Sequence, residues 1–220
     1  MLMSTYLEAA ETAHAALTRI DQAAGDGDFG DNLRGGLRGV VAALPADAGL
    51  TTEFTVAGTY FLDEVGGTSG PLIGLLLQNV AVSLGRDGET DAALVAGLEA
   101  GTAAIQRVGE AVVGDRTMVD TLAPTLDDLR TSGDPVDWAA IAGRALEHAR
   151  ATASLSPRMG RASYVGDRAL GVPDAGAMGI ALLFWALASR SSSLAFPSEL
   201  ASPSEPASSS EPASSSELEA

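Results

Sequence analysis

Cysteine and lysine are both absent from the 220 residues of this chain. Without cysteine, the chain has no disulfide and no thiolate that could serve as a nucleophile or a metal ligand. All 13 basic residues are arginine, which excludes a P-loop lysine, a Schiff base and a lysine general base. A polyphosphate bound here would have its charge met by metal ions, backbone N–H groups and arginine.

Long apolar runs and a net positive charge are also missing. No stretch of about 18 apolar residues occurs, so no membrane span is expected. The first residues lack the basic and apolar regions of a secretory signal. The formal net charge is −16, whereas nucleic-acid binding requires a basic surface. We therefore expect a cytoplasmic protein with no nucleic-acid or membrane partner.

The last thirty residues differ in composition from the rest. Ser-Glu-Pro-Ala-Ser-Ser occurs from Ser204 and again from Ser210, and residues 191–220 hold five glutamates and no base. Such a segment buries too little apolar surface to offset its chain entropy. We expect one folded domain over residues 1–190 and a disordered Ser/Pro/Glu/Ala-rich tail over residues 191–220. This tail is either a dispensable extension or a solubilising or docking segment.

The folded part has the pattern of an all-α protein, since strand-like alternation is scarce. Eight helices are expected, at residues 3–20, 31–43, 51–64, 70–84, 90–108, 118–130, 137–153 and 174–189. Short connections favour antiparallel neighbours and hence a bundle or a closed helical barrel. The connection at residues 154–173 is long and mixes arginine, tyrosine and glycine, which is typical of a lid over an anionic ligand.

Three acidic residues, Asp21, Asp26 and Asp28, stand on a glycine-rich turn between the first two helices. Carboxylates that are forced together repel one another unless a cation lies among them. Hard oxygen ligands without cysteine or histidine favour Mg²⁺ or Ca²⁺, and the spacing is not that of the helix–loop–helix calcium site. This leaves Mg²⁺, which commonly accompanies phosphate. A solvated acidic turn is the alternative interpretation.

Further motifs have both a functional and a structural interpretation. Residues 66–71, Gly-Gly-Thr-Ser-Gly-Pro, lead into an apolar helix, so they form either a phosphate-binding N-terminus or an ordinary cap. Asp115 and Arg116 could be a surface pair of little energetic value. Met118 could be a core residue or the wall of a purine site. Asp174 could simply cap the last helix.

The two histidines, His14 and His148, lie within helical patterns. Neither is near a serine or aspartate in an arrangement that suggests a catalytic triad. Both are therefore expected to be structural or surface residues.

Four motifs, at residues 25–32, 66–71, 114–118 and 160–177, together resemble the nucleotide-binding L subunit of dihydroxyacetone kinase. The same unit forms the C-terminal domain of the single-chain, ATP-dependent kinases. The resemblance implies an eight-helix antiparallel up-and-down barrel with the nucleotide at one end. The related domain of fatty-acid kinases typically has an Asn-Ser-Gly second loop, which fits residues 67–70 less well.

The resemblance also implies roles for individual residues. Asp21, Asp26 and Asp28 look like the ligands of two Mg²⁺ ions that in turn hold the phosphates. No side chain is implied as a catalytic residue, since positioning and charge neutralisation by the metals would do the work. The residues implied to lie at the nucleotide are Phe29, Gly30, Asp31, Asn32, Thr68, Ser69, Gly109, Met118, Arg161, Asp174, Ala175 and Gly176.

Three positions depart from the family pattern. Phe29 replaces a typical histidine, Asp31 stands where an uncharged residue is usual, and Ala175 replaces a proline. Phe29 and Asp31 could alter the phosphate pocket or the way that phosphoryl transfer is assisted.

The implied reaction transfers a phosphoryl group from Mg²⁺-bound ADP or ATP to dihydroxyacetone, which a histidine of a separate K subunit holds covalently. The chain would be active only with that partner, in a homodimer or hetero-oligomer. Because the chain stands alone, we favour the phosphotransferase-linked form, in which a phosphohistidine protein recharges bound ADP. The alternatives are an ATP-dependent kinase subunit for another ketose such as erythrulose, and a catalytically impaired nucleotide-sensing module.

Overall fold

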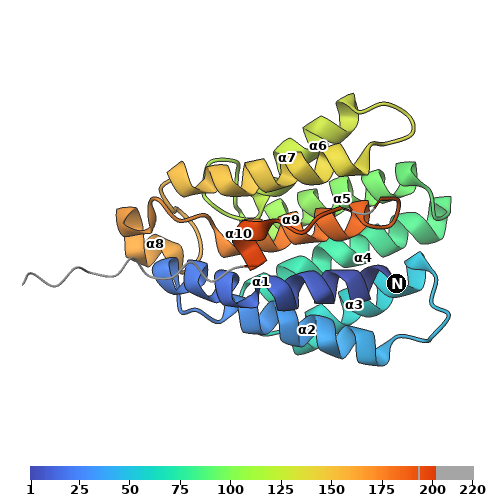
Figure 1. Cartoon of the computed structure of the whole chain (residues 1–220), viewed down its shortest axis with the longest axis horizontal. Coiled ribbons are helices and arrows are strands. Elements are labelled where there is room, and N and C mark those ends of the chain that lie inside the picture. Colours follow the sequence, from blue (N-terminus) through green and yellow to red (C-terminus); the bar gives the residue numbers. More distant parts are fainter. Residues whose placement is uncertain (193, 202–220) are drawn as a thin grey trace, which may run out of the picture.

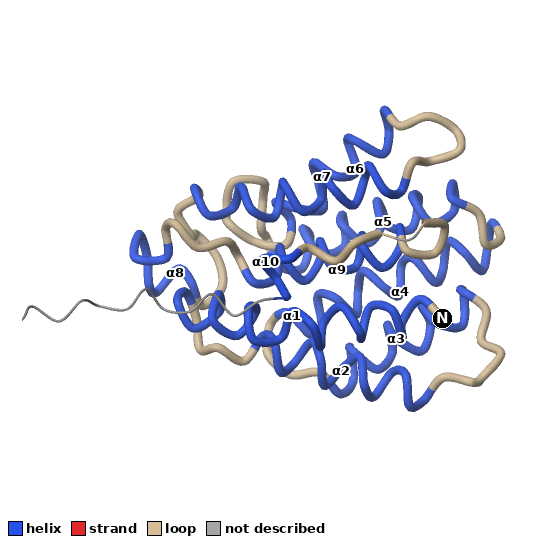
Figure 2. Tube along the Cα trace, in the orientation of Figure 1, coloured by secondary structure: helices blue, strands red, loops and turns tan. Residues whose placement is uncertain are grey.

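The computed structural model describes residues 1–192 and 194–201, and these contain helices and turns but no strand (Figures 1 and 2). All eight expected helices are present, with ends that differ from the expected ones by at most four residues. They are α1 (Leu2–Ala24), α2 (Phe29–Ala43), α3 (Leu50–Glu64), α4 (Ser69–Asp87), α5 (Asp91–Gly109), α6 (Val119–Thr131), α7 (Trp138–Ala151) and α9 (Ala175–Ala188).

The eight long helices form a closed ring. Each packs against the next one along the chain, and α9 returns to pack against α1. Because consecutive helices run antiparallel, the connections α1–α2, α3–α4, α5–α6 and α7–α9 all lie at the same end of the ring (Figure 1). The expected antiparallel up-and-down barrel is therefore confirmed.

Apolar side chains from every side of the ring fill its interior. Leu17, Leu37, Phe54 and Leu77 have no appreciable exposure to solvent. Helix α9 is buried on nearly all sides, since every residue in it except Trp185 is buried. A helix that is apolar all round is typical of a core position, which explains the Ala- and Leu-rich sequence of α9.

The long connection between α7 and α9 is not structureless. It contains the short helix α8 (Ala162–Val165) and two 3-10 turns, Thr152–Ser154 and Gly166–Ala169. We call residues 155–173 the lid segment. At its far end Asp174 caps α9, because its Oδ1 atom accepts a hydrogen bond from Ala177 N at 2.8 Å, as the sequence indicated.

The packed part of the chain extends past the expected boundary at residue 190. Residues 194–201 lie against the barrel and end in the short helix α10 (Ser198–Ala201), which contacts α1. Leu200 is buried, and the ring of Phe196 packs edge-on against Trp185 with a centroid distance of 5.3 Å. These apolar residues explain why the segment packs. The rest of the expected tail, residues 202–220, lies outside the described residues.

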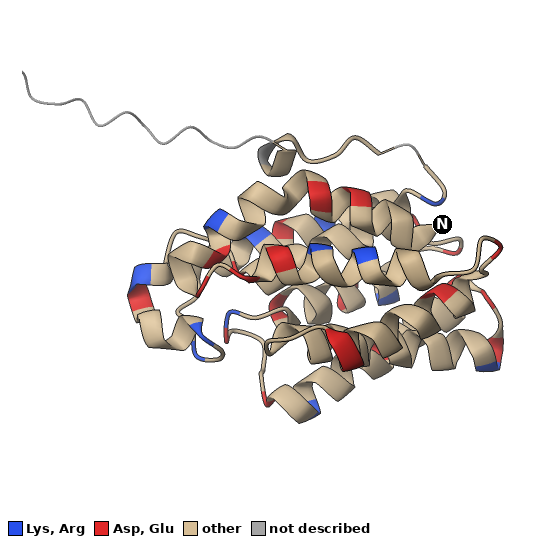
Figure 3. Ribbon diagram, turned by 90° about the horizontal axis from the view of Figure 1, so that it is seen from below, with Lys and Arg blue, Asp and Glu red and all other residues tan. Residues whose placement is uncertain are grey.

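Acidic residues occur along the whole length of the barrel, with arginines interspersed among them (Figure 3). Among the described helices, none combines the length and the apolarity needed to cross a bilayer.

Candidate functional site

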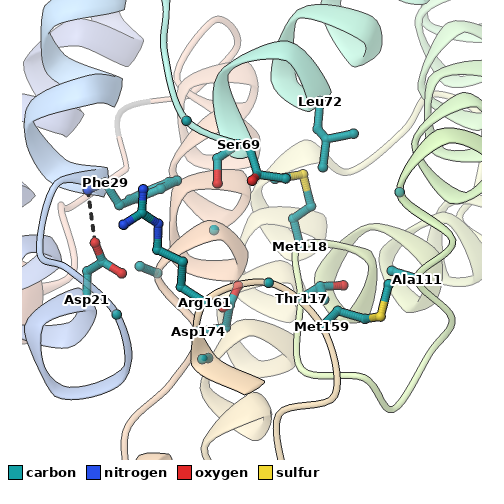
Figure 4. A pocket seen from close by; sticks show the side chains of 18 of the residues that line it. Asp21, Phe29, Ser69, Leu72, Ala111, Thr117, Met118, Met159, Arg161 and Asp174 are labelled. Carbon is teal, nitrogen blue, oxygen red and sulfur yellow. Dashed lines mark hydrogen bonds between the residues drawn. The ribbon is translucent and has the colours of Figure 1, made fainter. Parts of the chain in front are cut away.

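A cavity of about 400 Å³ opens at the end of the barrel where the four connections meet. Its walls come from the α1–α2 turn, the α3–α4 turn, the α5–α6 loop, the lid segment and the start of α9 (Figure 4). The structure therefore brings together motifs that are far apart in the sequence, from Asp21 to Gly176. The predicted residues that line the cavity are Asp21, Asp26, Asp28, Phe29, Asn32, Thr68, Ser69, Gly109, Met118, Arg161, Asp174, Ala175 and Gly176.

The α1–α2 turn gathers the three predicted metal ligands. Asp21, Asp26 and Asp28 each offer a carboxylate oxygen, and these oxygens all lie within 4.8 Å of one another. Gly25 is needed there, because a Cβ at this position would lie 2.6 Å from Asp21 Oδ1. Gly27 has a φ of +82°, which a residue with a side chain rarely adopts. The turn is thus shaped to hold the carboxylates together.

The electrostatics of this turn favour a cation. The pKa of Asp28 is raised, first by partial burial and then by the charges of Asp26 and Asp21, while Arg161 opposes the shift. Arg161 reaches into the cavity from the lid segment (Figure 4). Its Nη1 atom contacts Asp26 Oδ2. Asp21 is fixed by its Oδ2 atom, which accepts a hydrogen bond from Phe29 N at 3.0 Å. Three oxygen donors at this spacing fit a hard divalent cation such as Mg²⁺.

The α3–α4 turn faces the carboxylates across the cavity. Helix α4 begins at Ser69, and Thr68 occupies its N-cap without a side-chain hydrogen bond to the helix. A Cβ at Gly70 would lie 2.3 Å from the Val65 carbonyl oxygen, so only glycine allows the chain to turn so closely into the helix. The N–H groups of an uncapped first turn bind anionic oxygens. This side of the cavity therefore suits phosphate.

An apolar wall lies beyond the α3–α4 turn. Met118 was predicted from the sequence, whereas the other side chains of this wall were not: Leu72, Ile105, Val108, Ala111 and Met159. Leu72 directly follows the motif at residues 66–71, and Val108 directly precedes Gly109. These adjacencies were the only signals available for the two residues. A flexible thioether and branched aliphatic groups suit the faces of a planar heterocycle.

Arg116 lies in the wall of the cavity and is not the surface residue that the sequence allowed. Its side chain is 1% exposed, and its Nη2 atom donates to the Val172 carbonyl at 2.8 Å. The preceding residue, Asp115, accepts at its carbonyl oxygen from Arg158 N at 3.1 Å. Two neighbouring residues of the α5–α6 loop thus hold both ends of the lid segment.

Asp174 lies between the lid segment and α9. Its backbone N–H donates to Thr152 Oγ1 at 2.8 Å, and its carboxylate caps α9. Burial raises the pKa of Asp174 to about 6, the charges of Asp120 and Asp21 add to this effect, and the Ala177 hydrogen bond and Arg116 oppose it. Protonation of this carboxyl group near neutral pH would change the charge inside the cavity.

Two of the predicted nucleotide residues, Gly30 and Asp31, do not line the cavity. Gly30 faces α1, where a Cβ would lie 2.8 Å from Thr18 Oγ1. The Asp31 side chain is 60% exposed and bonds to His14 Nε2 at 2.9 Å and to Arg34 Nη2 at 2.6 Å. The structure does not support the expectation that the Asp31 side chain alters the phosphate pocket, because successive helical residues point in different directions.

Phe29 is the other departure from the family pattern that bears on the phosphates. It lines the cavity, but most of its ring packs against α9. The side chain is 6% exposed, and its Cζ atom would lie 2.6 Å from a Cβ at Gly179 of α9. The ring therefore fills space that a glycine leaves open on the neighbouring helix. Its contribution to polar contacts comes from the backbone N–H that binds Asp21.

The two histidines lie outside the cavity, as expected. His14 of α1 bonds to Asp31 of α2, and His148 of α7 bonds to Asp128 Oδ2 of α6 at 2.8 Å.

Comparison with known proteins gives consistent matches. Residues 23–189 match the family described as the DAK2 domain. The chain is 38% identical over 194 residues to an L-erythrulose 1-kinase of Mycolicibacterium smegmatis, covering 84% of this chain and 34% of that protein. It is 36% identical over 177 residues to the ADP-binding subunit DhaL of a PEP-dependent dihydroxyacetone kinase of Listeria innocua, covering 78% of this chain and 84% of the subunit.

Solved structures give the same result. The crystal structure of the dihydroxyacetone kinase from C. freundii in complex with AMP-PNP and Mg²⁺ superposes with a TM-score of 0.67 at 27% identity. The match covers 86% of this chain and 33% of that one. The chain thus spans about a third of the erythrulose kinase and of the C. freundii enzyme, and most of the DhaL subunit.

Proposed function

Since the chain belongs to the DAK2 domain family, we propose that it is the nucleotide-binding subunit of a small-ketose kinase. It would bind ADP or ATP with Mg²⁺ and pass a phosphoryl group to a ketose, most simply dihydroxyacetone, held on a separate K subunit. The observation that carries the proposal is the clustering of three carboxylates opposite the uncapped N-terminus of α4 within one cavity.

The residues of the cavity divide into three groups in this proposal. Asp21, Asp26 and Asp28 would hold Mg²⁺, with two ions by the family resemblance. Bound Mg²⁺ supplies neutralisation of the phosphate charge and alignment of the phosphoryl group for transfer. The N–H groups at the start of α4, with the hydroxyls of Thr68 and Ser69, would bind the phosphates.

The remaining parts position the nucleotide and exclude water. Met118, beside Gly109, would pack against the base together with the rest of the apolar wall. Arg161 would add positive charge above the phosphates, and the lid segment that carries it would cover them. No side chain is required as a nucleophile, in keeping with a reaction that depends on position and charge.

The phosphoryl donor is the finer part of the proposal. The DhaL relative from Listeria innocua is covered over 84% of its length and is the ADP-binding subunit of a PEP-dependent dihydroxyacetone kinase. We therefore favour bound ADP that is recharged by a phosphohistidine protein. The second candidate is an ATP-dependent subunit for a four-carbon ketose, because the identity to an L-erythrulose and a D-erythrulose kinase is 38% and 40%.

Reconstitution tests the proposal and separates its two forms. The purified chain is combined with a K subunit of a dihydroxyacetone kinase, and phosphorylated sugar is measured with dihydroxyacetone or erythrulose. A phosphohistidine donor protein with catalytic ADP, or ATP alone, supplies the phosphoryl group. Product in the first arm supports the phosphotransferase-linked form, and product in the second supports the ATP-dependent form. If the chain binds nucleotide but yields no product in any arm, it is a nucleotide-sensing module.

A further inference from the structure

We propose that Arg161 is a built-in competitor of the divalent cation, because its guanidinium group and the cation use the same carboxylate, Asp26. Binding of the cation would then release the lid segment from the acidic turn and leave Arg161 available to the phosphates. This inference rests on the proposed function, and it adds an order of events to it: cation first, then nucleotide, then closure.

Arg161 and Asp26 are in direct contact. Arg161 Nη1 meets Asp26 Oδ2, one of the three carboxylates whose oxygens lie within 4.8 Å of one another. A guanidinium N–H and a divalent cation bind the same lone pairs of a carboxylate oxygen. While the ion pair is formed, a positive charge lies directly against that oxygen, so the approach of a second cation to it is opposed by repulsion from the guanidinium group.

The α1–α2 turn carries more negative charge than Arg161 can neutralise. Three carboxylates carry a charge of about −3, and Arg161 offers one positive charge to them. One arginine offsets only part of the repulsion among the three carboxylates. A divalent cation that contacts all three oxygens therefore binds the turn more strongly than Arg161 does.

The contact between Arg161 and Asp26 can open without disturbing the core. The side chains of Arg161 and Asp26 are 62% and 33% exposed. No residue of α8, which follows Arg161 directly, is buried. Little packing therefore holds this part of the lid segment in place, and the ion pair with Asp26 ties it to the acidic turn.

Two glycines of the lid segment are placed to act as hinges. Gly160 and Gly166, with φ angles of +64° and +62°, stand on either side of residues 161–165. Outside these glycines the lid segment is held to the α5–α6 loop, at Arg158 by Asp115 and at Val172 by Arg116. Motion is thus confined to the piece that carries Arg161. Glycines at the edges of a moving segment absorb the required change in φ and ψ.

This arrangement predicts effects of opposite sign for one substitution. Arg161→Gln should raise the affinity for the cation when no nucleotide is present, because a competitor is removed. The same substitution should lower the affinity for ADP in saturating Mg²⁺, because a positive charge beside the phosphates is lost. An arginine that only bound phosphate would change the second affinity and leave the first unaltered.

The test uses Mn²⁺ as a paramagnetic probe, with binding followed by electron paramagnetic resonance on the full chain without nucleotide. Arg161→Gln should bind Mn²⁺ roughly two- to fivefold more tightly than the wild type, as expected for loss of an exposed ion pair. Arg168→Gln is the matched control. It removes the same charge from the same segment, but Arg168 Nε bonds to the Val165 carbonyl within the lid segment. Its Mn²⁺ affinity should equal that of the wild type.

Hydrogen exchange of residues 160–166 supplies a second readout. In the wild type, Mg²⁺ alone should speed exchange in this stretch, and in Arg161→Gln exchange should be fast with or without Mg²⁺. The inference is overturned if Arg161→Gln binds Mn²⁺ no more tightly than the wild type, or if Arg168→Gln has the same effect. Failure of the proposed function gives a different result: the wild type and Asp26→Asn would both fail to bind Mn²⁺.

Discussion

The buried guanidinium of Arg116 donates from Nη2 to the carbonyl of Val172 at 2.8 Å, across 56 positions of the chain. The bond joins the α5–α6 loop, which carries Met118, to the end of the lid segment just before Asp174. Arg116 has a φ of +63° and is 1% exposed, so this loop is built around its side chain. The apolar wall of the cavity and the lid segment are thereby one connected unit.

Replacement of Arg116 by methionine should separate this unit. The Val172 carbonyl would lose its donor, and an unsatisfied buried acceptor costs about 1–3 kcal/mol. The cost is limited because Arg116 Nε and Nη1 have no hydrogen-bond partner in the described residues, so their removal relieves a penalty. We expect lower stability in urea unfolding and faster hydrogen exchange at residues 169–173. Arg107→Met, at an exposed arginine of α5, should change neither quantity, and equal effects of the two would contradict the account.

Asp174 predicts a pH dependence of stability. Its pKa of about 6 in the folded protein lies above the ordinary value of 3.8, so the folded state binds this proton more tightly than the unfolded state does. The contribution to stability is therefore fully present below about pH 4 and is lost as the pH rises through 6. Asparagine still caps a helix but carries no charge. The melting temperature of Asp174→Asn relative to that of the wild type should therefore increase as the pH is raised from 4 to 7. A difference that stays constant with pH would contradict the prediction.

Two glycines of α4 should respond oppositely to alanine. At Gly70 the new Cβ would lie 2.3 Å from the Val65 carbonyl oxygen, so the start of α4 must shift, at a cost of about 1–3 kcal/mol. At Gly85 the nearest atom would be Thr51 Cγ2 at 3.7 Å, an ordinary contact. Gly85→Ala should therefore stabilise the helix by about 0.5–1 kcal/mol. Urea unfolding measures both, and ADP affinity should fall only for Gly70→Ala.

Asp26 lines the cavity, whereas Asp31 lies outside it, so substitutions of the two aspartates should have different effects on nucleotide binding. Asp26→Asn removes a proposed metal ligand and should weaken Mg²⁺-dependent ADP binding by about tenfold or more. Asp31→Asn changes a side chain that bonds to His14 and Arg34 outside the cavity, so ADP affinity should stay within about twofold. A large loss of affinity in Asp31→Asn, measured by calorimetry, would show that this carboxylate does reach the nucleotide.

The sequence was sufficient for the helices because their signals are local. Apolar spacing and caps such as Asp174 depend on residues within one or two turns, and the barrel follows from short antiparallel connections. The acidic turn was likewise predictable, since Asp21, Asp26 and Asp28 lie close together in the chain. Thirteen of the fifteen predicted site residues line the cavity, with Gly30 and Asp31 as the two that do not.

What the sequence did not reveal depends on contacts between distant segments. Leu72 and Ile105 have ordinary helical surroundings, and only the closure of the barrel turns them into a wall of the cavity. The buried state of Arg116 depends on carbonyls more than fifty residues away. The packing of Phe196 and Leu200 was hidden by a polar, proline-containing context, because composition averages over the few apolar residues that find a place on the barrel.

The most direct test of the central claim is a calorimetric titration of the purified, nucleotide-free chain with ADP, in Mg²⁺ and again in EDTA. If the carboxylates hold the phosphates through Mg²⁺, ADP should bind saturably in Mg²⁺ and bind little or not at all in EDTA. The Asp26→Asn variant should lose much of its affinity for ADP in Mg²⁺. Equal binding in both buffers would contradict the role of the carboxylates. No binding in either buffer would contradict the kinase-subunit function itself.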